Sequence, residues 1–257
     1  MKLMMRMDLK TGAIIGAAVL TIAVLFRVPP IAQDPGYHIF ADQRTRFGIP
    51  HFWNVISNGP FVVLGIMGMF NVALNRTPGY LHELKPVSFT FYLGVFLTGW
   101  ASAYYHLNPV NQTIVWDRLA LTVLFMAVFS SIWGEHISIS TARKMVWPLI
   151  VVGMASVIYW YVTESRGRGD LRFYALVQYL PMILLPAIML FSQSKLTGVA
   201  YIWGLMLAYA LAKVAEVLDG PIYRFSDGFS GHEIKHWVAA VGIFIYYLAG
   251  FKRKRIR

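Results

Sequence analysis

The chain has 257 residues, of which 57% are hydrophobic and only 14% are charged, and its formal net charge is +11 at pH 7. Soluble domains carry about 25% charged residues, so this composition excludes an ordinary water-soluble protein and indicates a lipid bilayer as the solvent. Many of the basic residues lie in short loops and at the chain ends, a distribution typical of membrane-protein loops rather than of a surface that binds nucleic acid.

Apolar blocks of membrane-spanning length predict the helices. They cover residues 11–27, 52–74, 87–106, 116–134, 145–163, 173–191, 197–217 and 232–251. The first block is short and has no small-x-small cleavage site before Pro29, which favours an uncleaved signal anchor over a cleaved signal peptide. Gly65 and Gly68 in the second block indicate close helix packing. The expected fold class is an all-α polytopic membrane helix bundle.

This bundle divides into a seven-span core and one extra N-terminal span. We expect residues 1–30 to hold a cytoplasmic stub and the extra span, 31–51 an outer-side loop, 52–251 the core, and 252–257 a basic cytoplasmic tail. The excess of Lys and Arg in alternate loops places both termini in the cytoplasm, as an even number of spans requires. The absence of cysteine and the extra first span suit a bacterial inner membrane.

Three histidines and one aspartate lie at the ends of apolar blocks, where ionisable groups are costly. His106 ends the third span, Asp117 begins the fourth, and the pair His232 and His236 begins the eighth. The topology therefore places all four at the same depth, on the outer side. Because the pair is four residues apart, its rings share one helix face, a spacing that suits a common metal ion. Without cysteine, any ligands must be nitrogen and oxygen atoms.

Three protein ligands and an open fourth position are typical of a catalytic zinc site. His106, His232 and His236 would supply three nitrogens, and the pKa of a water in the open position would fall towards about 7. Asp117 would accept a hydrogen bond from that water and move its proton. Ser102 lies four residues before His106, on the same helix face, where its hydroxyl would donate to the oxyanion of a carbonyl substrate.

Each assisting residue also has a structural interpretation. Asp117 is adjacent to Arg118, so a simple ion pair or a helix-start carboxylate remains an alternative. A serine in a membrane helix, such as Ser102, usually packs at an interface or bonds its own backbone. Ser230 and Glu233 are three apart, as in a capping box, which gives the glutamate a structural role at the start of the last helix.

Other polar residues in the apolar blocks are interpreted as structural. Lys213 and Glu216, three apart in the seventh span, are expected to pair with each other. A lone histidine near a helix end is more often an interfacial side chain than a ligand. Four histidines are therefore left unassigned: His38, His51, His82 and His136.

Four segments of the core carry a family resemblance. They are Phe52-Trp-Asn-Val-Ile-Ser-Asn58, Ser102-Ala-Tyr-Tyr-His106, Asp117-Arg-Leu and Ser230-Gly-His-Glu-Ile-Lys-His236. In this order and combination they resemble the alkaline ceramidase family, within the superfamily of seven-span membrane hydrolases that includes adiponectin-type receptors. The resemblance extends over residues 52 to 236.

The resemblance implies a zinc-dependent membrane amidase. Such an enzyme hydrolyses the N-acyl bond of ceramide, or of a ceramide-like lipid, to a free fatty acid and a sphingoid or related amine, by attack of zinc-bound water. The implied zinc ligands are His106, His232 and His236, with Ser102 and Asp117 as catalytic residues. Animal members carry an acidic calcium-binding segment before the Phe-Trp-Asn motif. The corresponding residues 42–51 have one carboxylate and two arginines, which does not support calcium.

Two other functions would use the same residues. Residues 232–236 match the H-E-x-x-H pattern of metalloproteases, with Glu233 as general base, and Leu218-Asp219-Gly220 is similar to a motif of intramembrane proteases. However, no Asp, Glu or His follows His236 to act as the downstream ligand. The other alternative is a zinc-containing seven-span receptor or scaffold of adiponectin-receptor type, which fold analogy alone allows.

The expected partners are the membrane and a lipid substrate, and nucleic acid is not expected. A transporter is disfavoured because no inverted repeat is visible. The sequence does not indicate an oligomeric state.

Overall fold

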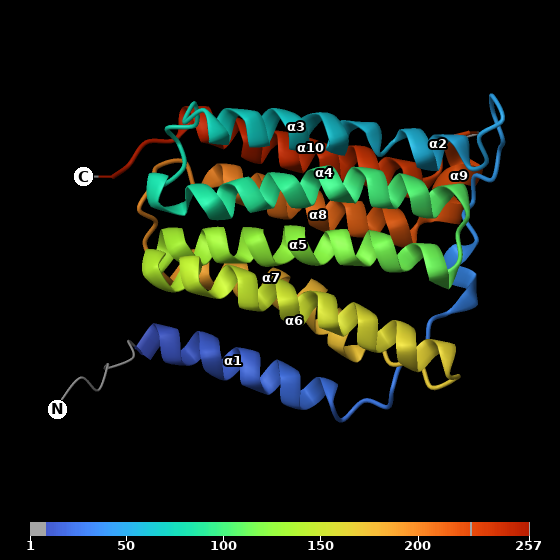
Figure 1. Ribbon diagram of the computed structural model, residues 1–257, viewed down its shortest axis with the longest axis horizontal. Coiled ribbons are helices and arrows are strands. Elements are labelled where there is room, and N and C mark those ends of the chain that lie inside the picture. Colours follow the sequence, from blue (N-terminus) through green and yellow to red (C-terminus); the bar gives the residue numbers. More distant parts are fainter. Residues whose placement is uncertain (1–8, 227, 257) are drawn as a thin grey trace.

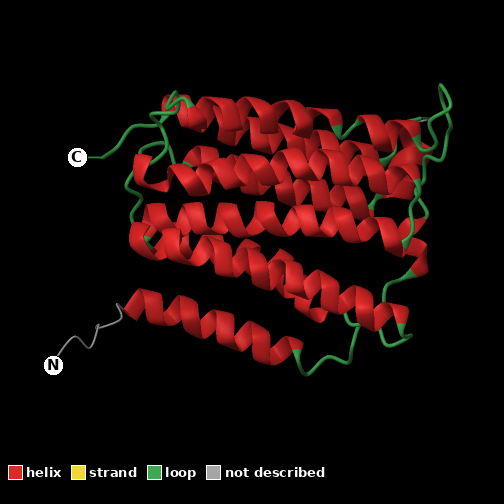
Figure 2. Ribbon diagram, in the orientation of Figure 1, coloured by secondary structure: helices red, strands yellow, loops and turns green. Residues whose placement is uncertain are grey.

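The structure of the protein is a computed structural model, which describes residues 9–226 and 228–256. The described residues form a bundle of long, nearly parallel helices (Figures 1 and 2), with no strand apart from isolated bridges. The helices are α1 (Leu9–Leu25), α2 (Phe52–Ile56), α3 (Gly59–Ala73), α4 (Lys85–Leu107), α5 (Asn111–His136), α6 (Ile139–Ser165), α7 (Arg172–Phe191), α8 (Ala200–Val217), α9 (Asp219–Ser226) and α10 (Gly231–Lys252). Two short 3-10 turns, η1 (Pro35–His38) and η2 (His82–Leu84), lie in the connections.

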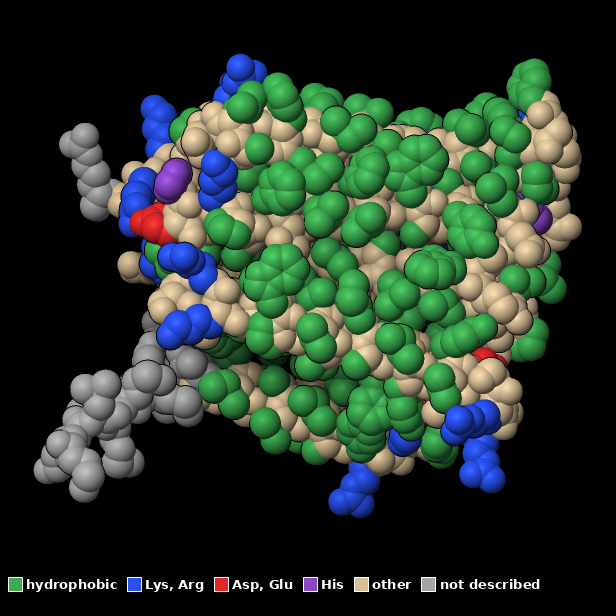
Figure 3. Space-filling model, viewed as in Figure 1, with side chains coloured by type: hydrophobic (Ala, Val, Ile, Leu, Met, Phe, Trp, Pro, Cys, Tyr) green, Lys and Arg blue, Asp and Glu red, His purple; other side chains and the backbone are tan. Residues whose placement is uncertain are grey.

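All eight predicted blocks are helical, and the expected all-α polytopic bundle is confirmed. Six helical segments of the described chain are long and apolar enough to cross a membrane: Phe52–Ala73, Asn111–His136, Ile139–Ser165, Arg172–Phe191, Ala200–Val217 and Gly231–Lys252. Apolar side chains cover the flank of the bundle, whereas Lys and Arg gather towards its ends (Figure 3). The chain is therefore an integral multi-pass membrane protein.

The remaining two predicted spans differ from these six for separate reasons. Helix α4 has 23 residues but is more polar, and it packs between α3 and α5, which shield it. The hydroxyls of Thr90 and Thr98 each donate to a backbone carbonyl one turn earlier, so both are satisfied within the helix. Helix α1 is shorter and packs against α7 at the edge of the bundle (Figure 1). The predicted cytoplasmic stub falls largely on residues 1–8, outside the described residues.

The first span of the core is broken, whereas the sequence predicts one continuous helix over 52–74. Helix α2 ends at Ile56, and α3 begins at Gly59 with Pro60 in its first turn. Because proline has no backbone N–H, Pro60 cannot donate to the carbonyl of Ile56, and the helical hydrogen-bond pattern is interrupted there. The break leaves Ser57 and Asn58 buried between the two helices.

The glycines of the second block are explained by close helix packing, as predicted. A Cβ atom added at Gly65 would lie 2.6 Å from the backbone nitrogen of Phe96, and one added at Gly68 would lie 2.0 Å from the ring of Tyr92. Both contacts are far shorter than van der Waals distance, so α3 and α4 can approach each other this closely only with glycine at these positions.

The basic segment after α10 is docked on the bundle. Arg253 is buried and makes a two-pronged ion pair with the carboxylate of Glu135, at the end of α5. Its Nε also donates to the carbonyl of Thr197 at 2.7 Å. Arg255 is largely exposed and pairs with Glu83 at 2.9 Å. The segment therefore connects α10 to the α5 end and to the loop before α8.

The ends of the helices determine where the candidate site lies. Figure 1 shows that α1 begins and α10 ends at one end of the bundle. Helix α4 ends, and α5 and α10 begin, at the opposite end. His106, Asp117 and the pair His232 and His236 consequently lie in one layer at that second end, as the predicted topology requires.

Candidate metal centre

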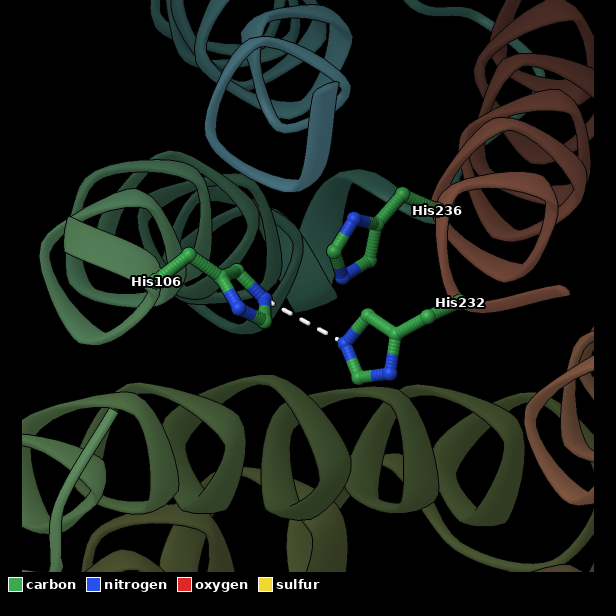
Figure 4. Close-up of side chains that lie close together, drawn as sticks. All are labelled: His106, His232 and His236. Carbon is green, nitrogen blue, oxygen red and sulfur yellow. Dashed lines mark hydrogen bonds between the residues drawn. The ribbon is translucent and has the colours of Figure 1, made fainter. Parts of the chain in front are cut away.

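Three histidine rings from two helices meet in the interior of the bundle. His106 lies in the last turn of α4, and His232 and His236 lie in the first two turns of α10. All three side chains are buried, with at most 5% of their surface exposed. One nitrogen of each ring lies within 4.8 Å of the others, and Figure 4 shows that the rings point to a common space. No other group of this kind is found in the described ranges.

The spacing of two of the rings fits a shared tetrahedral metal ion, with zinc as the example. With zinc–nitrogen bonds of 2.0–2.1 Å, two ligand nitrogens on one tetrahedral ion are about 3.4 Å apart. The Nε2 atoms of His106 and His232 are 3.4 Å apart. A hydrogen bond between two neutral rings would explain that pair alone. The third ring, His236, also brings a nitrogen within 4.8 Å, so the group as a whole could hold one metal ion.

Ser57 determines which nitrogen of His236 is free to bind a metal. The Ser57 hydroxyl donates to the carbonyl of Asn54 at 3.2 Å and lies 2.7 Å from Nδ1 of His236. With that hydrogen on Asn54, the hydroxyl is an acceptor for an Nδ1–H group, and the tautomer that fits this arrangement has its lone pair on Nε2. An outer hydrogen bond of this kind orients a metal-binding imidazole. It arises directly from the break between α2 and α3.

A segment that precedes the core covers the centre from the end of the bundle. We call residues 31–42 the strap. The ring of Phe40 in the strap lies 4.8 Å from the ring of His106 and 4.4 Å from that of His232, measured between centroids. Asp219 connects the strap to α10, because its two carboxylate oxygens accept from the backbone N–H groups of Ala41 and His232 at 2.9 and 2.8 Å.

The start of α10 has the predicted capping box. The Ser230 hydroxyl accepts from the backbone N–H of Glu233 at 3.1 Å, and the Glu233 carboxylate accepts from the backbone N–H of Ser230 at 3.4 Å. The structural interpretation of this pair is therefore confirmed. The cap begins the helix at Gly231 and so places the two histidines of α10 in its first two turns.

Asp42 ends the strap beside this capping box, and Arg44 neutralises it. The Arg44 guanidinium donates to both carboxylate oxygens of Asp42, at 2.9 and 2.6 Å, and its backbone N–H adds a further bond at 2.9 Å. Burial alone would raise the pKa of Asp42, but hydrogen bonds from Arg44 and from the Glu233 side chain, with the positive charge of Arg44, outweigh it and lower the pKa to about 2. The single carboxylate of residues 42–51 is thus held by a guanidinium.

A cavity of about 410 Å³ extends from the centre into the bundle. Ser102, Asp117 and His236 line one part of it, so three of the five predicted site residues share one chamber. Leu124 lies seven residues after Asp117 in α5, and Ile243 lies seven residues after His236 in α10. Both also line the cavity, which therefore extends about 10 Å along these helices. The rest of the inner wall is mostly apolar, including Leu121, Phe125 and Leu205.

Asp117 does not form the ion pair with Arg118 that was an alternative interpretation. One guanidinium nitrogen of Arg118 donates to the side chain of Gln33 in the strap, and the guanidinium lies over the ring of Trp160, 4.0 Å from its centroid. Within the described residues, Asp117 has no ion pair. Its Oδ1 atom is buried and has no hydrogen-bond partner there. Asp117 as a whole is half-buried and lines the cavity beside Ser102 and His236.

Two further predictions concern polar residues around the centre. Lys213 and Glu216 pair with each other, as predicted, and Lys235 joins them at 2.7 Å from the same carboxylate. His38, which was left unassigned, has a structural role in the strap: its two ring nitrogens lie 2.8 Å from the Tyr105 hydroxyl and 2.9 Å from the side-chain oxygen of Asn111.

Sequence reasoning missed several residues that shape the centre. Ser57 lies within the Phe-Trp-Asn segment, three residues before Pro60. This proline is the sequence signal that indicates a break in the helix near Ser57. Asp219 was considered only as part of a protease-like motif. Phe40 and Gln33 lie in a loop whose path over the centre depends on tertiary contacts, and no local pattern indicates it.

Comparisons with known proteins assign no family to this chain. No family model matches it, and no curated protein matches it significantly.

Proposed function

We propose that this protein is a zinc-dependent membrane amidase, which hydrolyses the N-acyl bond of ceramide or a ceramide-like lipid to a free fatty acid and a sphingoid or related amine. The observation that carries the proposal is a cavity with a mostly apolar interior, which Ser102 and Asp117 line together with His236, one ring of the buried three-histidine centre. A chamber with one polar end and a mostly apolar wall suits a lipid with a polar linkage at one end of a long chain.

The ligands of the metal would be His106, His232 and His236. When bound, zinc supplies a Lewis acid and lowers the pKa of water from that of bulk solvent towards about 7. The protein's contribution is to hold three neutral imidazoles in place, away from bulk water. The hydrogen bond between Ser57 and Nδ1 of His236 serves this purpose for one ring, and packing of Phe40 serves it for the other two.

Amide hydrolysis adds the oxygen of water to the acyl carbon, breaks the C–N bond and transfers a proton to the departing nitrogen. The carboxylate of Asp117, which lines the cavity and has no ion-pair partner within the described residues, would take the proton from water and deliver it to the amine. The hydroxyl of Ser102 would donate to the carbonyl oxygen as negative charge develops on it. Both groups are on helices, which hold them in fixed positions.

The position of Glu233 favours the amidase over an H-E-x-x-H protease. In such a protease the glutamate acts on the water at the metal. Here the Glu233 side chain turns back to the capping box, and it is not part of the wall that Ser102, Asp117 and His236 form. Asp117, unlike Glu233, lines the cavity together with Ser102 and His236.

We also propose that the centre faces the non-cytoplasmic side of a bacterial inner membrane. The opposite end of the bundle holds Arg76 in the loop after α3, Arg143 and Lys144 near the start of α6, Lys195 in the loop after α7, and the basic residues of the C-terminal segment. This asymmetry supports a cytoplasmic location for that end.

The test is metal analysis combined with lipid mass spectrometry on the purified protein. We expect about one zinc per chain, and release of fatty acid from N-acyl sphingosine or a related N-acyl lipid. Full zinc loading without turnover across a panel of N-acyl lipids would contradict the amidase and favour a receptor or scaffold. Absence of zinc at saturating metal would contradict the centre itself.

A further inference from the structure

One arginine in the cavity wall has a donor that no protein group uses. Arg118 lines the cavity next to Asp117 and is 94% buried, since only 6% of its surface is exposed. Its Nη1 atom is buried and makes no hydrogen bond within the described residues. No carboxylate in the described part of the chain forms an ion pair with it. A buried guanidinium is costly unless its charge and donors are satisfied.

The surroundings of Arg118 hold it in one position. Its guanidinium lies between aromatic rings, 4.0 Å from the centroid of Trp160 and 5.0 Å from that of Tyr174. Its Nη2 atom donates to the side-chain oxygen of Gln33, and the backbone N–H of Gln33 donates to Glu164 at 2.9 Å. Stacking and the bond to the strap fix the plane of the fork, and the residue that carries the unused Nη1 group lines the cavity.

The charges around the cavity leave this arginine uncompensated. The buried and half-buried charged residues of the wall are three cations and two carboxylates: Arg118, Lys213, Lys235, Asp117 and Glu216. Glu216 is shared by the two lysines. Asp34 also lines the cavity, but it is exposed and accepts from the backbone N–H of Gly36 at 2.8 Å. An anion in the chamber would balance the excess of positive charge.

We propose that Arg118 binds the negatively charged head group of the lipid, so that the protein selects N-acyl lipids with a carboxylate or a phosphate near the amide. The substrate class rests on the proposed amidase, whereas the anion site stands on the geometry of Arg118 alone. A planar guanidinium binds two oxygens of a carboxylate or phosphate side by side, and its free edge determines which end of the lipid lies near Asp117.

Binding of lipids that cannot be hydrolysed tests the site independently of turnover. The zinc-loaded full-length protein would be titrated with two pairs of lipids, each pair consisting of one anionic and one neutral member. The first pair is oleyloxyacetate and 2-(oleyloxy)ethanol, in which a carboxylate is replaced by a hydroxymethyl group. The second pair is oleyl phosphate and oleyl alcohol. We expect the anionic member of at least one pair to bind about 10- to 100-fold more tightly, as for a charge-assisted hydrogen bond. The pair that shows the difference identifies the head group as carboxylate or phosphate.

Substitution of Arg118 attributes this preference to the arginine. Arg118→Gln should abolish the difference within each pair, and Arg118→Lys should retain part of it. Arg172→Gln is the matched control, because Arg172 lies at the same end of the bundle, paired with Asp170, but outside the cavity wall. A preference that survives in Arg118→Gln would show that the metal or a lysine takes the anion, and it would overturn the proposal.

Two results separate this inference from the proposed function. Equal binding of anionic and neutral lipids by the unsubstituted protein would refute the anion site, even if the protein cleaves N-acyl lipids. A clear preference for anionic lipids that depends on Arg118, without cleavage of N-oleoylglycine or N-oleoylethanolamine, would establish the anion site and refute the amidase.

Discussion

The hydroxyl of Ser57 lies 2.7 Å from Nδ1 of His236, although the two residues are 179 positions apart in the sequence. The contact joins the break in the first core span to the last helix. It assigns the Nδ1 proton of His236 to a hydrogen bond and leaves Nε2 for a metal ion. A serine in the first core span thus takes part in the centre without being a ligand.

Ser57→Ala should weaken zinc binding by about 10- to 100-fold while the three histidines remain, as for loss of an outer hydrogen bond to a metal ligand. Competition with a chelator of known affinity measures this change. Ser130→Ala is the matched control, because the Ser130 hydroxyl is buried without a partner in the described structure, and its loss should leave the affinity unchanged. Equal weakening in both variants would contradict a specific role for Ser57.

His106→Ala should remove zinc and amidase activity together, since it removes one of three ligands. Asp117→Asn and Ser102→Ala should instead retain zinc and slow turnover by about 10²- to 10⁴-fold, because they remove a proton acceptor and a hydrogen-bond donor. Metal content and turnover number, measured on the same preparations, separate the two classes. Full retention of zinc by His106→Ala would contradict the ligand set.

Glu233→Gln should leave zinc content unchanged and turnover within about threefold, because glutamine also serves in a capping box. The assay is the same lipid hydrolysis, with unfolding temperature as a check on the helix cap. Complete loss of activity with the fold intact would make Glu233 the general base and favour the protease alternative.

Arg253→Ala should destabilise the protein by about 3–5 kcal/mol, because it leaves the Glu135 carboxylate buried without its partner. Arg255→Ala, two residues further along, should cost no more than about 1 kcal/mol, because its pair with Glu83 is exposed to solvent. Denaturant unfolding in one detergent compares them. Equal effects would show that burial of the C-terminal segment does not matter for stability.

Asp42 predicts an acid-sensitive contribution to stability. Its pKa is about 2 in the folded protein, below the usual 3.8, so its pair with Arg44 stabilises the fold above pH 4. That contribution is lost as the pH falls from about 4 to about 2. Asp42→Asn should therefore lower the unfolding temperature at pH 7, and the difference from the unsubstituted protein should shrink at pH 3. A difference independent of pH would assign the effect to packing.

Long apolar blocks made the helices predictable, because a chain in a bilayer must satisfy its backbone hydrogen bonds within each span. The meeting of His106 with His232 and His236 was predictable for a related reason. All three are at span ends, and the number of spans between them determines that these ends share one side. The i, i+4 spacing then restricts two of the rings to one helix face.

The contacts that complete the centre depend on tertiary structure. Pro60 signals a break, but the distance from Ser57 to α10 follows from how α2 packs. The direction of Arg118 could not be read from its position beside Asp117, because the aromatic rings of Trp160 and Tyr174 lie on other helices. Arg253 seemed part of a solvated tail by composition, and only the buried carboxylate of Glu135 explains its burial.

Phe40 has a kinetic consequence. With this ring against His106 and His232, the strap hinders the direct approach of a hydrated ion to these two rings from the aqueous end of the bundle. The other approach leads through a mostly apolar chamber, which a hydrated cation enters reluctantly. Extraction by a chelator should therefore proceed at a rate set by opening of the strap, independent of chelator concentration once the chelator is in excess.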